Sequence, residues 1–214
     1  MDLRRFLDGR GGQLGFLTYQ HASLVIQCVV IGVVIALVIA ALVYRSRAGA
    51  AFATAVASVG MTVPSLALLA LLLLVFGLGV TPSVTMLTFY ATLPILTSAI
   101  VGLQAVPPAL VEAARGLGMP RWRVLATVEL PNAWPVILTG IRVSTQLVVG
   151  VATVVAYVLG PGLGSLIFTG LSRLGGAGAL ESALVGTVLV VAVALVLDGL
   201  LVLLGRLTVS KGLR

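Results

Sequence analysis

Long stretches without a charged side chain decide what this chain can fold into. Residues 22–43 contain no Asp, Glu, Lys or Arg, and the same is true of residues 48–111. About 20 helical residues, at about 1.5 Å each, cross a bilayer core of about 30 Å. The first stretch therefore predicts one membrane-spanning helix. The second, 64 residues long, predicts two such helices joined by a turn.

The composition indicates the same class of protein. Only 9% of the residues are charged and 60% are hydrophobic, whereas an ordinary soluble domain is roughly 25% charged. The single cysteine, Cys28, cannot form a disulfide framework. The single histidine, His21, argues against zinc clusters and a bis-histidine haem, and we expect it at a membrane edge. The sequence therefore predicts an all-α integral membrane protein without a metal site.

Five spanning helices are expected in a single domain of residues 1–214. Pro64 lies within the second helix and Pro94 within the third. Prolines are tolerated in membrane helices where neighbouring helices satisfy the freed carbonyls, and they kink the helix. Gly77, Gly79 and Pro82 supply the turn between these two helices. The expected helices cover, approximately, residues 22–43, 52–76, 83–105, 135–158 and 181–204.

The distribution of Lys and Arg predicts the orientation, because cytoplasmic loops carry an excess of both. With the N-terminus outside, eight of them lie in the cytoplasm: Arg45, Arg47, Arg115, Arg121, Arg123, Arg206, Lys211 and Arg214. Four lie outside: Arg4, Arg5, Arg10 and Arg173. The opposite orientation reverses this ratio, so an outside N-terminus and a cytoplasmic C-terminus are expected. Topology rather than nucleic-acid binding then explains the net charge of +7.

The charged segment of residues 107–131 predicts two short helices in a cytoplasmic loop. Pro108 is preorganised for a helix start. Glu112, in the expected first turn, and Arg115, near the end, complement the helix dipole. Pro120 begins the second helix and Pro131 ends it. By local chemistry alone the segment is either a folded connector or a docking element.

Three groups of residues in this segment resemble the EAA loop of permease subunits from binding-protein-dependent ABC importers. They are Glu112-Ala113-Ala114, the pair Gly116 and Gly118, and Glu129-Leu130-Pro131. Further stretches are similar to the osmoprotectant branch, which imports glycine betaine, choline, carnitine or proline betaine. These stretches are residues 62–69, 93–96, 140–142 and 160–164. Pro161 and Pro107 depart from the family pattern, since a small residue and an Asp are usual there.

The resemblance implies a type I ABC importer permease fold in a bacterial inner membrane, with several partners. These would be a second permease, identical or paralogous, two cytoplasmic ATPase subunits that bind ATP and Mg, and an extracytoplasmic binding protein. It also implies that the loop couples to the ATPase through Glu112, Ala113, Ala114, Arg115, Gly116 and Gly118. Glu112 either contacts the ATPase or stabilises only its own helix end. The chain has no G-x-x-x-x-G-K-[ST] sequence and no convincing catalytic set, so we expect neither an enzyme nor a cofactor of its own.

Polar residues within the expected spans are candidates for the translocation path, because such groups face protein or water rather than lipid. The candidates are Pro64, Ser65, Thr145, Gln146 and Thr153. A structural hydrogen bond to a neighbouring helix would explain each of them equally well. Quaternary ammonium ions favour aromatic cages, and the 12 Phe, Trp and Tyr residues form no cluster in the sequence. High-affinity selection is therefore expected of the binding protein.

Arg142 and Asp198 lie at matching depths, each roughly 10–12 Å from the cytoplasmic end of its expected helix. They are predicted to pair and to lock the fourth helix to the fifth. The alternative is that Arg142 snorkels to phosphate while Asp198 faces water.

Two other classes of membrane protein fit the sequence less well. An ion-coupled secondary transporter commonly has repeated halves, but five helices do not divide into two equal repeats. A small channel-forming protein has no need of a patterned two-helix loop.

Overall fold

The computed structural model describes residues 7–158 and 160–209, and every regular element in that part of the chain is a helix. Four of the basic residues that predict the orientation lie outside the described residues: Arg4, Arg5, Lys211 and Arg214. The α-helices are α2 (Gly11–Val43), α3 (Arg47–Thr62), α4 (Ser65–Phe76), α5 (Val80–Gln104), α6 (Pro108–Gly116), α7 (Arg121–Val124), α8 (Leu130–Ala152), α9 (Gly164–Ser172) and α10 (Ala179–Thr208). A π-helical turn, η1 (Leu125–Glu129), joins α7 to α8, and a 3₁₀ turn, η2 (Val154–Val158), follows α8.

Four helical stretches are each long and apolar enough to cross a membrane. They are Gly11–Val43, Val80–Gln104, Arg121–Val155 and Ala179–Thr208. A fifth span is added if α3 and α4 are counted together, although they meet at an angle of 95°. The chain is thus an all-helical, multi-pass membrane protein.

The bend between α3 and α4 differs from the single kinked helix expected over residues 52–76. Val63 and Pro64 both adopt extended backbone, with ψ angles of 125° and 128°. Proline disfavours helical backbone in the residue before it and lacks the N–H that would continue the ladder. The helix therefore ends at Thr62 and restarts at Ser65. Neither piece, at 16 and 12 residues, reaches the roughly 20 residues that a span requires.

The start of α8 also differs from the expectation. The helix was expected near residues 135–158 with Pro131 ending a separate short helix, but helical backbone continues from α7 through η1 into α8. Pro131 falls in the first turn of α8. The wider π-helical turn just before it offers room for a residue that cannot donate a hydrogen bond.

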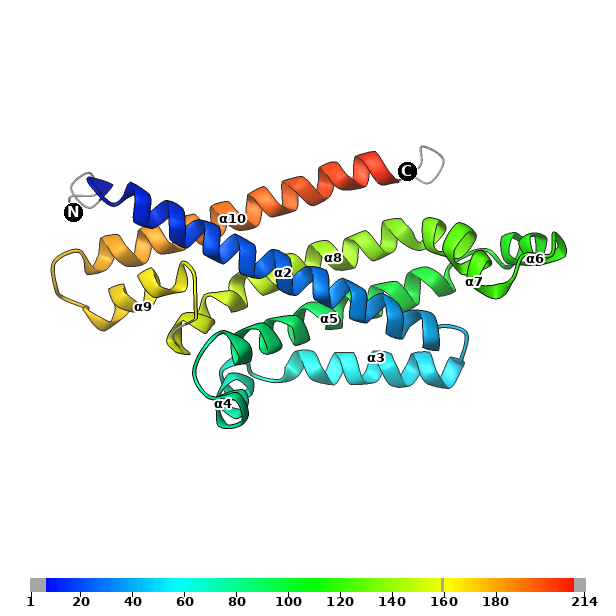
Figure 1. Ribbon diagram of the computed structural model, residues 1–214, viewed down its shortest axis with the longest axis horizontal. Helices are drawn as coiled ribbons and strands as arrows, with labels where there is room; N and C mark the ends of the chain where they lie inside the picture. The colour runs from blue at the N-terminus through cyan, green and yellow to red at the C-terminus, as the bar shows by residue number, and fades with distance from the viewer. Residues whose placement is uncertain (1–6, 159, 210–214) are drawn as a thin grey trace.

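The central helix is α5, which packs against both α2 and α8. Figure 1 shows α2 crossing over these two helices. Two glycines permit the close approach. A Cβ at Gly140 of α8 would lie 2.5 Å from the Ser98 Cβ of α5, and one at Gly32 of α2 would lie 2.8 Å from the Ala91 Cβ. Glycine interfaces of this kind let membrane helices pack backbone to backbone. The outermost helix, α10, packs on α8 and α9 and leaves much of its surface uncovered.

The two ends of the molecule carry different elements. Figure 1 shows the N-terminal end of α2 and α9 at one end of the long axis, and α6 and α7 at the other. The turn between α2 and α3 lies toward the α6 end as well. A hydrogen bond of 2.7 Å from Trp134 Nε1 to Thr208 Oγ1 joins the start of α8 to the last residue of α10. The arginines at residues 45–47, 115–123 and 206 thus belong to one end, and Arg10 and Arg173 to the other.

Candidate functional site

The α6 helix and the turn after it protrude from the helical bundle (Figure 1). The helix begins at Pro108, so Glu112 is its fifth residue. It was expected in the first turn but lies just beyond it. Arg115 does lie in the last turn. After it the Gly118 N–H donates to the Arg115 carbonyl at 2.9 Å, and Gly118 has a φ of +79°. Left-handed backbone of this kind ends helices and favours glycine.

The surface of this protrusion is apolar and basic. Of the six expected coupling residues, Glu112, Ala113, Arg115, Gly116 and Gly118 are exposed and Ala114 is buried. Leu117 is 79% exposed and Trp122 is 66% exposed, and the Arg123 guanidinium lies 5.5 Å from the Trp122 ring centroid. Exposed large apolar side chains grouped with charges are typical of surfaces that bind another protein. The segment is folded, and its exposed apolar and basic side chains leave both a folded connector and a docking element open.

Glu129 is a residue at the base of this segment whose role the sequence did not reveal. It is 3% exposed. Its carboxylate accepts a hydrogen bond of 2.5 Å from the Tyr44 hydroxyl, and its Oε2 lies 3.0 Å from Nη2 of Arg45. In the sequence it was one member of the Glu129-Leu130-Pro131 pattern. Its place directly before a long apolar helix sets it apart from the other charges of the segment, but does not show that it is buried.

Arg142 of α8 and Asp198 of α10 form a two-point ion pair. The distances are 2.9 Å from Nε to Oδ1 and 2.9 Å from Nη2 to Oδ2. Gln146, one helical turn further along α8, donates to Asp198 Oδ1 at 3.2 Å. The structure therefore brings together three of the residues that the sequence singled out. The side chains of Arg142 and Asp198 remain 39% and 24% exposed.

The exposed side of this cluster forms a polar stripe along α8. Thr139 and Gln146 are exposed and Arg142 lies between them. Residues spaced by three or four positions share one face of a helix. Exposed Val136, Val143 and Leu147 flank this stripe. Polar groups at membrane depth are usually covered by protein or water rather than lipid, so the stripe is a candidate for contact with water or a second subunit.

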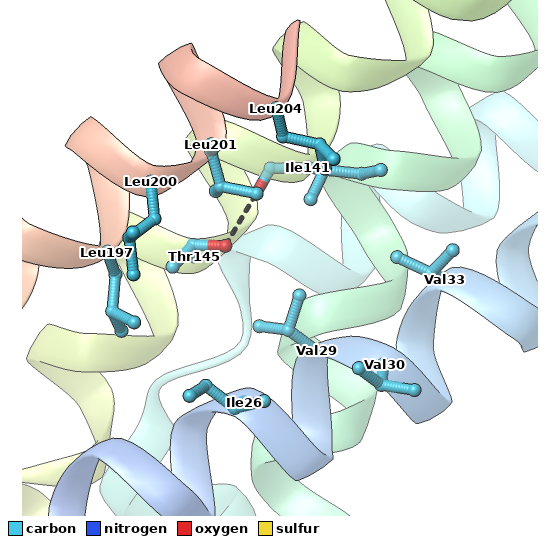
Figure 2. A pocket seen from close by; sticks show the side chains of 10 residues that line it. All are labelled: Ile26, Val29, Val30, Val33, Ile141, Thr145, Leu197, Leu200, Leu201 and Leu204. Carbon is cyan, nitrogen blue, oxygen red and sulfur yellow. Dashed lines mark hydrogen bonds between the residues drawn. The ribbon is translucent and has the colours of Figure 1, made fainter. Parts of the chain in front are cut away.

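The other candidate path residues lie elsewhere. Thr145 is buried, its hydroxyl donates to the Ile141 carbonyl at 2.8 Å, and it faces a cavity of about 320 Å³ between α2, α8 and α10. Figure 2 shows that the other side chains lining this cavity are all Ile, Val or Leu. Thr153 follows α8 and donates to Gly150 O at 2.7 Å. Pro64 and Ser65 lie at the α3–α4 bend. The five candidates do not form one cluster.

His21, which was expected at a membrane edge, is fully buried within the protein. Its Nε2 lies 3.2 Å from the Val149 carbonyl near the end of α8. A Cβ at Gly162 would lie 2.9 Å from His21 Nδ1, so the glycine-rich turn after α8 packs directly on the ring. His21 thus joins α2 to the region where α8 ends. Among the described residues, no group of three or more His, Cys, Asp or Glu could hold a metal ion.

The chain is similar to known transport proteins in both sequence and fold. Residues 29–209 match the family described as binding-protein-dependent transport system inner membrane component. The chain is 34% identical to the glycine betaine/carnitine/choline transport system permease protein OpuCB of Bacillus subtilis, covering 98% of this chain and 94% of that protein. It is also 34% identical to the osmoprotectant import permease protein OsmW of Salmonella typhimurium, over the full length of both. Among solved structures, an amino acid ABC transporter crystallised with histidines shares the fold, with a TM-score of 0.75, 23% identity and coverage of 96% of this chain and 98% of that one.

Proposed function

Because the chain belongs to the family of inner membrane components of binding-protein-dependent transport systems, we propose that it is the permease of an ATP-driven importer for quaternary-ammonium osmoprotectants. The observation that carries the substrate class is the full-length similarity to permeases named for glycine betaine, carnitine and choline, and for osmoprotectants. The chain is a transport subunit and not an enzyme. Hydrolysis of ATP belongs to a partner ATPase.

The proposed assembly contains two permeases, two cytoplasmic ATPase subunits that bind ATP and Mg, and an extracytoplasmic binding protein. The α6 end faces the cytoplasm, because it carries the larger group of arginines. The N-terminal end of α2 and the α9 region then face the binding protein. This orientation places the protruding α6 helix where an ATPase can reach it.

Coupling to the ATPase occurs through the exposed side of α6 and the turn after it. A short helix can dock in a groove of a partner and move with it as a rigid body. Exposed Ala113 permits close approach, while Leu117 and Trp122 supply apolar contacts and Gly118 turns the chain out of the groove. Glu112 is exposed on the same helix and available to the partner.

The translocation path runs along the polar stripe of α8. Gln146, Arg142 and Thr139 offer hydrogen-bonding groups to a hydrated solute, and the second permease closes the opposite side. Thr153 and the α3–α4 bend at Pro64 and Ser65 are proposed to belong to the outer part of this path. Thr145, which faces the apolar cavity, contributes by packing rather than by contact with the solute.

Uptake in cells tests this function. The chain is produced together with a second permease, an ATPase and a binding protein from the same genome, in a bacterial strain that lacks its own osmoprotectant transporters. Radiolabelled glycine betaine or choline should accumulate at high osmolarity, and a variant of the ATPase without its P-loop lysine should abolish accumulation. Uptake that persists without a working ATPase would instead indicate an ion-coupled transporter or a channel.

A further inference from the structure

Glu129 is a buried carboxylate at the junction between the protruding segment and the membrane helices. It is the last residue of the π-helical turn η1, and α8 begins at the next residue. Burying a charged group is costly unless it is paired and hydrogen-bonded. The position of Glu129 therefore requires specific partners, and its partners come from a distant part of the chain.

Those partners form the turn between α2 and α3. The Tyr44 hydroxyl donates to Glu129 Oε2 at 2.5 Å, and Arg45 Nη2 lies 3.0 Å from Oε2 and 3.4 Å from Oε1. The Arg45 guanidinium also lies 5.0 Å from the centroid of the Tyr44 ring. Burial, together with the neighbouring Glu129 carboxylate, raises the pKa of Tyr44 to about 12. The hydroxyl is therefore a protonated donor at any physiological pH.

Tyr44 also holds the other end of the segment. Gln104, the last residue of α5, donates from Nε2 to the Tyr44 carbonyl at 2.9 Å. The segment from residue 105 to residue 128 thus leaves the bundle at Gln104 and returns at Glu129, and both of these residues bind Tyr44. We call this set of Tyr44, Arg45, Gln104 and Glu129 the clasp. It ties the base of the protrusion to α2 and α3.

The clasp holds the end of η1, the π-helical turn between α7 and α8, which could otherwise bend. Helices bend where a π-helical turn interrupts the regular ladder, and η1 is such a turn, between α7 and α8. A force applied to α6 would either flex η1 or move the whole bundle. With Glu129 held by Tyr44 and Arg45, the force reaches the α2–α3 turn as well as α8.

We propose that Glu129, held by Tyr44 and Arg45, is a positioning residue that passes movement of the α6 protrusion to the membrane helices. The inference rests on the proposed function, since it concerns how ATP hydrolysis by the partner is coupled to transport. Without the clasp the ATPase still docks and still hydrolyses ATP. Its movement is absorbed at η1, and fewer solute molecules cross for each ATP hydrolysed.

The test measures solute transported per ATP hydrolysed by the purified complex in proteoliposomes. The variants are Tyr44→Phe, which removes one oxygen atom, Glu129→Leu, which removes the carboxylate, and the two combined. Each single variant should retain ATPase association while the transport ratio falls about fivefold or more, the lower end of typical coupling effects. The combined variant should fall no further than the worse single one, because both break the same contact. Amide hydrogens of α6 and α7 should also exchange faster in Tyr44→Phe.

Thr208→Val is the matched control. It removes the hydroxyl that bonds Trp134 at the same end of the molecule but outside the clasp, and its transport ratio should equal that of the wild type. An unchanged ratio in Tyr44→Phe and Glu129→Leu, or losses that multiply in the combined variant, would overturn the proposal. If Glu129→Leu does not fold, the nearly isosteric Tyr44→Phe decides alone. A wild-type complex without ATP-driven uptake would overturn the proposed function itself, and this inference with it.

Discussion

Replacing Asp198 with Asn should loosen the contact between α8 and α10, because it removes the negative charge that faces Arg142. Two hydrogen bonds of 2.9 Å join these side chains. Hydrogen bonds between membrane helices contribute about 0.6 kcal/mol on average and at most about 1.7 kcal/mol. Asn keeps one accepting oxygen but turns an N–H group toward the guanidinium in place of the other, so one bond is lost and the second is weakened, which gives about 1–3 kcal/mol. An uncompensated arginine at the centre of a membrane helix costs about 2.5–3.5 kcal/mol, which is an upper bound for a half-exposed side chain nearer the helix end.

The assay is reversible unfolding in mixed micelles of increasing dodecyl sulfate content. It compares the wild type, Asp198→Asn, Arg142→Gln and the double variant. Asp198→Asn should lose about 1–3 kcal/mol of unfolding free energy, and adding Arg142→Gln should cost little more. Thr187→Val is the control on α10, since its hydroxyl donates to the Ala183 carbonyl of its own helix, and it should change stability by less than about 0.5 kcal/mol. Losses from the two single changes that add within about 0.5 kcal/mol would refute the coupling.

Three further predictions address topology, docking and packing. Cysteines introduced at Leu117 and Ser172 should be labelled by an impermeant thiol reagent from opposite sides of the membrane, and labelling of both from outside would contradict the proposed orientation. Gly116→Arg adds bulk to an exposed position with open space around it, so membrane insertion should be normal while uptake and ATPase association fall sharply. Gly118→Asn introduces a residue that tolerates left-handed backbone, so it should transport better than Gly118→Arg. If Gly116→Arg, Gly118→Asn and Gly118→Arg all transport as well as the wild type, this segment is not the docking element. Gly140→Leu should lower unfolding free energy by about 1–3 kcal/mol in the same micelle assay, because even a Cβ there would lie 2.5 Å from Ser98, and unchanged stability would show that α5 and α8 pack differently.

The sequence was sufficient to predict the apolar helices, but it predicted only some of their first and last residues. The expected helix at residues 83–105 is α5 at Val80–Gln104, since glycines and a proline mark its start. The first helix begins at Gly11 rather than near residue 22, because residues 11–21 also contain no charged residue and no proline that would end a helix. The family was predicted from the pattern of residues 112–131, and the match over residues 29–209 confirms it.

Two prolines show why local sequence was insufficient. Pro94 stays within α5, where Gly140 of α8 packs against its carbonyl and the Thr97 hydroxyl donates to that carbonyl at 2.9 Å. Pro64 is exposed, and the chain bends by 95° there. Both prolines lie in similar apolar stretches. The difference arises from long-range packing that periodicity does not encode.

The half-exposed Arg142–Asp198 pair and the buried Glu129 network differ in the same way. Arg142 and Asp198 were predictable as a pair because charges within apolar helices are rare and their depths match. Glu129 lies among the charges of a segment expected to face water, so nothing in the sequence marked it as buried. Its partners, Tyr44 and Arg45, lie more than 80 residues away. Only the fold brings them together.

Transport by the purified complex tests the central claim most directly. The permease, its ATPase and a second permease are reconstituted in liposomes that enclose ATP and Mg, with the binding protein and radiolabelled glycine betaine outside. We predict accumulation above the external concentration only when ATP and the binding protein are both present. Accumulation driven by a sodium or proton gradient without ATP, or uptake at the same rate without the binding protein, would contradict the account.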